Sequence, residues 1–252
     1  MASATERSGE GSPLASGRDE AASGAAVRDM FASVARRYDF LNHFLSLGRD
    51  IAWRRVAARS LSDILSRPGS RVADVCCGTG DLTFCLGRRS QGLVTGADFC
   101  RPMLAIARDK RGPAAHCVQF LEADALRLPF ADASLDAVTS AFGFRNLASY
   151  AHGIEELRRV LKSGGRLAIL EFSQVRWPLF GPLFRFYFHY VLPRLGTWVS
   201  GVEGPYAYLP ESVAQFPDQE ALAEKLRGAG FHDVSYRNFS GGIAALHVGT
   251  KA

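Results

Sequence analysis

The chain has 252 residues, 47% hydrophobic and 22% charged, which suffices for one sizeable domain and leaves little for a second. The net charge of +5 is mild, and basic residues gather only in short pairs such as Arg36–Arg37. Nucleic-acid binding is therefore not expected. The net charge indicates no more than a weak preference for anionic surfaces, including membrane lipid.

The five cysteines, at positions 76, 77, 85, 100 and 117, form no C-x-x-C pair and no set with zinc-ligand spacing. We expect a reducing cytoplasm and no metal site. The adjacent Cys76 and Cys77 have two interpretations. They fill space as small apolar side chains, or one is a reactive thiol whose thiolate is favoured beside a helix N-terminus.

The first 26 residues are rich in Ala, Ser and Gly and have no apolar core, so we expect a disordered tail over 1–26 that is neither a secretory signal nor a transit peptide. One domain is predicted over 27–252. It begins with an N-terminal helical cap over 27–66, where apolar residues recur at helical spacing and two helices are broken near Gly48.

The hydrophobic period then changes to short apolar runs at 71–77, 92–99, 117–124, 135–142 and 165–172. Helical stretches lie between most of them, at 81–89, 101–111 and 150–161. Strands that alternate with helices indicate a doubly wound α/β fold, with a mostly parallel sheet covered on both faces. Ligands of such sheets bind at the carboxyl ends of the strands.

An aromatic insertion over 174–216 interrupts this pattern. Its stretch 177–199 contains Arg185, His189, Arg194 and three prolines, so we reject a membrane span. Either it is an ordinary core helix, or it is a substrate lid whose basic groups lie at a lipid interface. An amphipathic helix over 217–230 and two strands joined through Gly241–Gly242 close the chain.

The glycine loop Gly78-Thr79-Gly80 follows the first predicted strand, which contains Asp74. Glycines let the backbone turn sharply and lie against a ligand, and the free amides of the next helix are donors. A dinucleotide fingerprint would place a third glycine where this chain has Thr83, which disfavours a nicotinamide cofactor without excluding it.

Acidic residues end the next two strands. Asp98 is placed to accept hydrogen bonds from both hydroxyls of a ribose. Asp124 is placed to accept from an adenine amino group, and Ala125 to offer a backbone amide to the ring. Each acid alone is as readily a solvated loop carboxylate or a helix cap, but three such features at successive strand ends indicate an adenosine ligand.

The order DVCCGTGD, ADFCRPML, EADALRLPF and LRRVLKSGGRLAILEF resembles the class I S-adenosylmethionine-dependent methyltransferases. More specifically, the chain is similar to the menaquinone and ubiquinone biosynthesis C-methyltransferases. The stretches that carry this second likeness are YDFLNHFLS, FGFRN, LKSGGRLAILEFS and PYAYLPESVAQFPDQ. The resemblance implies a Rossmann-like sheet of seven strands with an antiparallel last strand, and a reaction on a polyprenylated quinol.

By position, the resemblance assigns cofactor contacts to Thr79, Asp98, Asp124 and Ala125. Four neighbouring positions complete the predicted set of cofactor-binding residues: Asp74, Gly78, Gly80 and Ala141. Ala141 stands where the family commonly has serine, so only backbone contact is expected there. Asp50 and Ser163 also depart from the family pattern, with aspartate for histidine and serine for proline.

Three residues are the catalytic candidates. Arg145 and Asn146 follow the fourth strand, where Arg145 would stabilise a developing phenolate and Asn146 would orient the ring hydroxyl. Tyr38 would orient the substrate, or else is a core aromatic of its helix. Three histidines are alternative bases, although histidines on helices more often pack or face solvent: His43, His152 and His189.

The sequence thus predicts a cytoplasmic enzyme, peripherally bound to the membrane, that uses S-adenosylmethionine to methylate a ring carbon of demethylmenaquinol or a related benzoquinol. Methylation at O or N of a soluble metabolite and a non-catalytic scaffold subunit are the alternatives. A homodimer or a complex of quinone-synthesis enzymes fits either activity.

Overall fold

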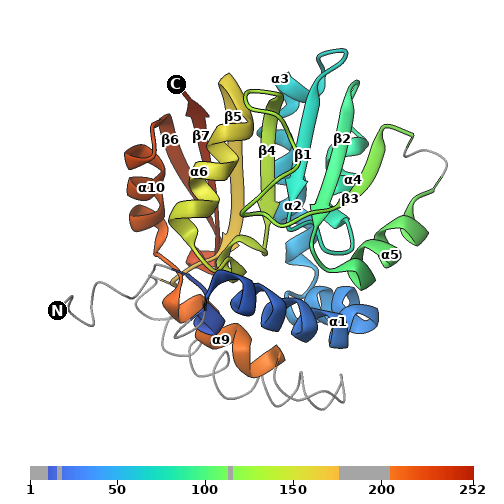
Figure 1. Ribbon diagram of the computed structural model, residues 1–252, viewed down its shortest axis with the longest axis vertical. Coiled ribbons are helices and arrows are strands. Elements are labelled where there is room, and N and C mark those ends of the chain that lie inside the picture. The colour runs from blue at the N-terminus through green and yellow to red at the C-terminus, as the bar shows by residue number, and fades with distance from the viewer. Residues whose placement is uncertain (1–10, 16–18, 113–115, 176–204) are drawn as a thin grey trace.

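The computed structural model describes residues 11–15, 19–112, 116–175 and 205–252. Its centre is a seven-stranded sheet in the order β3-β2-β1-β4-β5-β7-β6. The first five strands pair in parallel, and β7 runs antiparallel to both of its neighbours. The predicted doubly wound α/β fold with an antiparallel last strand is confirmed (Figure 1).

The first five strands lie where the apolar runs predict them, and no strand end differs from its predicted position by more than four residues. The strands are β1 (Arg71–Val75), β2 (Leu93–Asp98), β3 (Val118–Glu122), β4 (Leu135–Ala141), β5 (Leu161–Phe172), β6 (Phe231–Phe239) and β7 (Ala244–Lys251). The helices are α1 (Glu20–Leu45), α2 (Arg49–Arg59), α3 (Ser62–Leu65), α4 (Asp81–Gly87), α5 (Arg101–Lys110), α6 (Tyr150–Val160), α9 (Pro205–Gln215) and α10 (Gln219–Gly228). The break near Gly48 and the closing strands around Gly241–Gly242 are also confirmed.

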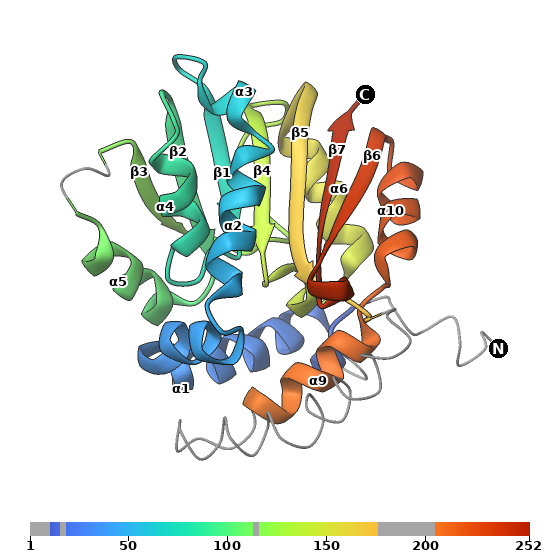
Figure 2. The same ribbon diagram turned by 180° about the vertical axis from the view of Figure 1, so that it is seen from behind.

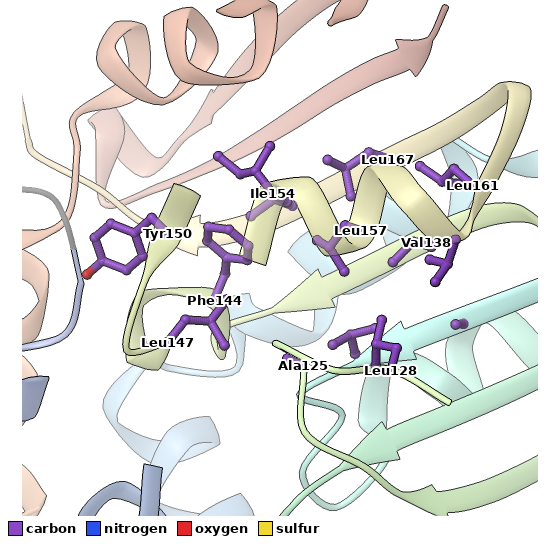
Figure 3. Close-up of a cluster of buried hydrophobic side chains, with 14 of the residues drawn as sticks. Ala125, Leu128, Val138, Phe144, Leu147, Tyr150, Ile154, Leu157, Leu161 and Leu167 are labelled. Carbon is purple, nitrogen blue, oxygen red and sulfur yellow. The ribbon is translucent and has the colours of Figure 1, made fainter. Parts of the chain in front are cut away.

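Helices cover both faces of the sheet, which explains why its central strands have no polar side. Helices α6 and α10 lie on one face, and α2, α3 and α4 lie on the other (Figures 1 and 2). Figure 3 shows the first of these two cores, where Ile154 and Leu157 of α6 pack over Val138 of β4. The cores fix the strand ends against which the ligand site is built.

Helices α1 and α9 lie across the carboxyl ends of the parallel strands (Figures 1 and 2). Both belong to segments that the sequence assigns to additions, α1 to the helical cap and α9 to the aromatic insertion. Most of the predicted lid over 174–216, including the stretch 177–199, lies outside the described residues. The edge of the sheet where ligands of this fold class bind is therefore covered by helices from outside the sheet layers.

The boundary of the expected tail at residue 26 is wrong. Helix α1 begins at Glu20, with Asp19 Oδ1 accepting a hydrogen bond from the Ala22 amide (2.7 Å) as an N-cap does. Ser23 and Val27 are buried at 0% and 1% exposure. Alanine is the best helix former, so the Ala-rich composition that indicated disorder also suits a helix once a neighbour covers it.

Candidate functional site

The glycine loop joins β1 to α4 at the carboxyl edge. Gly78 and Gly80 both have left-handed backbone conformations, with φ of 55° and 86°. A Cβ on Gly80 would lie 2.9 Å from the ring of Phe120, whereas one on Gly78 would meet no atom within 4 Å. Gly80 is thus required for packing against β3, and Gly78 leaves the outer side of the loop open to a ligand.

Asp98 ends β2 beside this loop and is 7% exposed. Its Oδ2 accepts from the Gly78 amide and its Oδ1 from the Cys100 amide, both at 2.8 Å. Burial raises the pKa of Asp98 to about 6, although these backbone hydrogen bonds favour the ionised form. The backbone amides thus orient the carboxylate, whose remaining capacity to accept hydrogen bonds is open to ligand hydroxyls.

Asp74, in β1, is 1% exposed and accepts hydrogen bonds from two hydroxyls. Thr83 donates to Oδ2 at 2.6 Å, and Thr139 of β4 donates to Oδ1 at 2.7 Å. Burial again raises the pKa, to about 6. Thr83 stands where a dinucleotide fingerprint has glycine, and here its hydroxyl anchors an acid under the loop.

A hollow lies over the loop, and it brings together four of the predicted cofactor residues with residues of α2 and α4. Its lining is Arg54, Asp74, Cys76, Cys77, Gly78, Thr79, Asp81, Leu82 and Ala141. Burial, together with nearby Asp98, raises the pKa of both Cys76 and Cys77 well above the usual thiol value. A thiolate is therefore disfavoured at this position, which favours the interpretation of the vicinal cysteines as small apolar groups.

The remaining adenosine candidates follow β3. Asp124 is exposed, and its Oδ1 accepts from the Leu126 amide at 2.9 Å. Ala125 is buried at 6% exposure and belongs to the core beneath α6. Asp124 is thus held by its own turn with its carboxylate accessible to solvent, which leaves its proposed role at an adenine ring as a prediction.

The FGFRN corner follows β4, where Arg145 and Asn146 lie in a short 3-10 helix (Phe144–Asn146). Arg145 is 4% exposed, and its Nη1 donates to Glu171 Oε1 at 2.8 Å and to the Phe142 carbonyl at 2.5 Å. Its Nε donates to Ser212 Oγ at 3.3 Å. The charge of Arg145 is therefore balanced by a buried carboxylate on β5, and any substrate oxygen would share it with Glu171.

Asn146 faces α9, since its Oδ1 accepts from the Tyr208 hydroxyl at 3.0 Å. Tyr208 is 7% exposed, and burial raises its pKa. Together with the Arg145–Ser212 contact, this ties α9 to the FGFRN corner. The sequence analysis missed Glu171, Tyr208 and Ser212, although all three fall within the stretches that carry the family likeness.

A charged network links the helical cap to the loop. Arg54 forms an ion pair with Asp50, which also lies 2.8 Å from His43 Nδ1. His43 Nε2 lies 3.6 Å from Asp81, whose Oδ1 accepts from Lys110 Nζ at 2.6 Å. Asp50, which departs from the family pattern, is thereby buried and neutralised rather than presented to a ligand.

Lys110 also donates to Thr79 Oγ1 at 3.3 Å, so Thr79 is held by α5 as well as by its own loop. Tyr38 lies in α1, but its side chain lies outside the described part. His152 is solvent-exposed in the first turn of α6, and His189 falls outside the described ranges.

None of the helices in 11–15, 19–112, 116–175 and 205–252 is long and apolar enough to cross a membrane. Within the same ranges, no group of three or more His, Cys, Asp or Glu side chains is arranged to hold a metal ion.

Comparison with known families and proteins gives consistent results. The model of the ubiE/COQ5 methyltransferase family matches residues 19–251. A demethylmenaquinone methyltransferase of Deinococcus radiodurans is 51% identical over 92% of this chain and 95% of its own. The protein of the same name from Thermus thermophilus is 50% identical over 88% of this chain and 100% of its own. A ubiquinone/menaquinone biosynthesis C-methyltransferase of Geobacter sulfurreducens is 43% identical over 90% and 89%.

Solved structures share the fold at lower identity. A SAM-dependent methyltransferase from Aquifex aeolicus has a TM-score of 0.54 at 21% identity, with 77% of this chain and 88% of that chain covered. The [4+2]-cyclase SpnF has a TM-score of 0.59 at 20% identity, covering 79% and 80%. Since a methyltransferase and a cyclase align equally well, these likenesses show the fold alone.

Proposed function

The chain belongs to the ubiE/COQ5 methyltransferase family, and from that premise we propose that it methylates a ring carbon of a polyprenylated quinol, with demethylmenaquinol as the first candidate. The methyl donor of this methyltransferase is S-adenosylmethionine. The observation that best supports the donor site is the pair of buried acids, Asp74 and Asp98, at neighbouring strand ends with pKa values raised to about 6. Such acids favour a ligand that brings hydroxyls and positive charge.

The residues present fit this donor. Asp98 would hold the ribose hydroxyls, Asp124 and Ala125 the adenine ring, and the open side of Gly78 the chain between them. Asp74 would favour positive charge in the hollow above it. When bound, S-adenosylmethionine supplies a methyl group on a positively charged sulfur, which is electrophilic without further activation. The protein's part is then alignment, worth about 7–11 kcal/mol of barrier when the geometry is good.

The FGFRN corner would activate the quinol. A ring hydroxyl makes the ring carbon nucleophilic when it is ionised or strongly hydrogen-bonded. Asn146, with Oδ1 already accepting from Tyr208, has its amide protons to offer to that oxygen. Arg145, held in place by Glu171, would share its charge with that oxygen as negative charge develops on it. Arg145 does not take the proton, because its pKa stays above about 12, so we assign that step to an ordered water.

We further propose that the protein works as a cytoplasmic, peripheral membrane enzyme, since a polyprenyl tail holds the quinol in the bilayer. The predicted lid over 174–216 would shield that tail. A homodimer or a complex of quinone-synthesis enzymes remains compatible with this arrangement. None of these finer statements is needed for the chemistry at the FGFRN corner.

The test is incubation of the purified protein with methyl-labelled S-adenosylmethionine and a short-chain demethylmenaquinol. We expect a labelled product whose methyl group resists reagents that cleave methyl ethers. A benzoquinol of the ubiquinone pathway is the second candidate, favoured by the Geobacter relative that is named for both quinones. Absence of label on carbon with either quinol would overturn the proposal, as would a cleavable O-methyl product.

A further inference from the structure

The corner between α1 and α2 displays apolar side chains to solvent. Among the described residues, the large hydrophobic side chains that are exposed are Leu47, at 83%, and Ile51, at 37%. Leu47 lies in the turn that precedes α2, and Ile51 lies in the first turn of α2, so both belong to the junction of α1 and α2. Scattered exposed apolar residues are ordinary, but here the two occur close together in the chain, at one junction of helices.

The backbone at this corner is unfavourable for the residue it holds. Leu47 has a left-handed conformation, with φ of 52°, followed by Gly48 at 71°. A left-handed conformation costs free energy for a leucine and much less for asparagine or glycine. Leu47 therefore stabilises the fold neither through its backbone nor through burial, which points to a contact outside the chain.

The surroundings are basic. The exposed residues of the segment 47–59 are all apolar or arginine: Leu47, Arg49, Ile51, Ala52, Arg55 and Arg59. The one acid of this segment, Asp50, is 3% exposed and turned inward to Arg54 and His43. We call the exposed residues Leu47, Arg49, Ile51, Ala52 and Arg55 the corner surface. It combines apolar side chains with two arginines, Arg49 and Arg55, for which the described residues provide no ion pair.

The corner surface lies at the end of the molecule where the ligand site opens. Helix α2 begins at the carboxyl edge of the sheet, close to α1 (Figures 1 and 2). Its inner side contributes Arg54 to the hollow that Asp74 and Gly78 also line. A flat surface seated on the corner would therefore lie next to the entrance of the site.

We propose that the corner surface docks on a membrane that contains anionic lipid, with Leu47 and Ile51 inserted at the interface and Arg49 and Arg55 against lipid phosphates. The apolar side chains suit the boundary of the acyl chains, and the flanking arginines suit the anionic headgroups above it. The inference rests on the proposed function for its purpose, because a quinol substrate is delivered from the bilayer. Its physical basis, however, is independent of which substrate is methylated.

The experiment is co-sedimentation of the full chain with vesicles of phosphatidylcholine alone or with 30% phosphatidylglycerol, roughly the charge density of an anionic membrane surface. We expect binding to the anionic vesicles. Leu47→Asn with Ile51→Gln should weaken it about tenfold or more, and Arg49→Ser with Arg55→Ser by a similar factor. Because asparagine suits the left-handed conformation, the first variant should keep the melting temperature of the parent chain.

A matched control removes two arginines elsewhere. Arg59→Ser with Arg89→Ser takes the same charge from the end of α2 and from the turn that follows α4, and it should change vesicle binding by less than about threefold. Equal binding by the parent chain and the Leu47 and Ile51 variant would overturn the proposal. So would loss of a concentration-dependent dimer in that variant, which would assign the corner to contact between copies of the chain.

Activity separates this proposal from the function above. The Leu47 and Ile51 variant should keep its rate on a short-chain quinol in solution and lose most of it on a long-chain quinol in vesicles. If the parent chain methylates neither quinol but its vesicle binding depends on the corner, the proposed function fails and the docking surface stands. Equal loss of rate on both quinols would contradict the docking proposal.

Discussion

The two halves of the carboxyl edge balance their charges differently. At the tips of β1 and β2, Asp74 and Asp98 are buried, and no ion pair among the described residues includes either. At the tips of β4 and β5, Arg145 and Glu171 neutralise each other at 2.8 Å. The first arrangement costs stability until a ligand arrives, whereas the second holds the fold together. Unbalanced charge thus indicates a binding site, and balanced charge indicates the frame around it.

The largest effect is expected from breaking the balanced pair. Arg145→Ala leaves Glu171 buried without its cation, which should lower the free energy of unfolding by about 3–5 kcal/mol. Urea denaturation measures it. The double variant Arg145→Met with Glu171→Gln should recover most of the loss, and its kcat then reports what Arg145 does for the chemistry. A loss below about 1 kcal/mol in the single variant would contradict a structural role for the pair.

The unbalanced acids should make stability depend on pH. The folded pKa of Asp98, about 6, lies above the unfolded value of 3.8, so its contribution is full below pH 3.8 and is lost as the pH rises through 6. Relative to Asp98→Asn, the ligand-free chain should lose on the order of 3 kcal/mol between pH 4 and pH 8. Denaturation of both proteins at the two pH values tests this, and a constant difference would show that Asp98 is not strained by burial.

Asp98→Asn, which should stabilise the ligand-free chain at neutral pH, should weaken ligand binding. Asp98→Asn removes a charged acceptor from two ribose hydroxyls, so its affinity for S-adenosylhomocysteine should fall about 100-fold. Asp109→Asn, an exposed acid on α5, is the matched control and should bind as the parent chain does. Titration calorimetry gives both constants. Equal affinities of the Asp98→Asn variant and the parent chain would contradict the assignment of the ribose to Asp98 at the end of β2.

The smallest effect concerns the contact between α9 and the FGFRN corner. Tyr208→Phe removes the hydrogen bond to Asn146 and should lower kcat about tenfold, with little change in the KM for S-adenosylmethionine. Tyr236→Phe, on β6 and away from this corner, serves as its control. Equal kcat for both variants would mean that the position of Asn146 does not depend on α9.

Much of this arrangement follows from local sequence. The period of apolar residues predicts the strands, and the chemistry of Gly78-Thr79-Gly80 and Asp98 predicts a loop and an acid at one edge. Both features depend on neighbouring residues in the chain, so they can be read without the fold. From the sequence, Thr83 indicates only that the third glycine of a dinucleotide fingerprint is missing. In the structure, its hydroxyl donates a hydrogen bond to Asp74.

The rest depends on contacts between distant segments. Glu171 and Tyr208 meet Arg145 and Asn146 across gaps of 26 and 62 residues, which no local pattern reveals. Likewise, the start of α1 at Glu20 could not be separated from a disordered Ala-rich tail until Ser23 and Val27 were seen to be buried. Side-chain charge in the sequence does not say which charges cancel.

The claim that Asp74 and Asp98 bind the methyl donor is tested most directly by the number of protons released when S-adenosylmethionine binds at pH 6. There, Asp74 and Asp98 are each about half protonated. Ligand hydroxyls and positive charge favour the ionised forms. Calorimetry in buffers of different ionisation enthalpy should show about one proton released per ligand at pH 6 and almost none at pH 8. No release at pH 6, or proton uptake, would contradict the assignment of these two acids to the methyl donor.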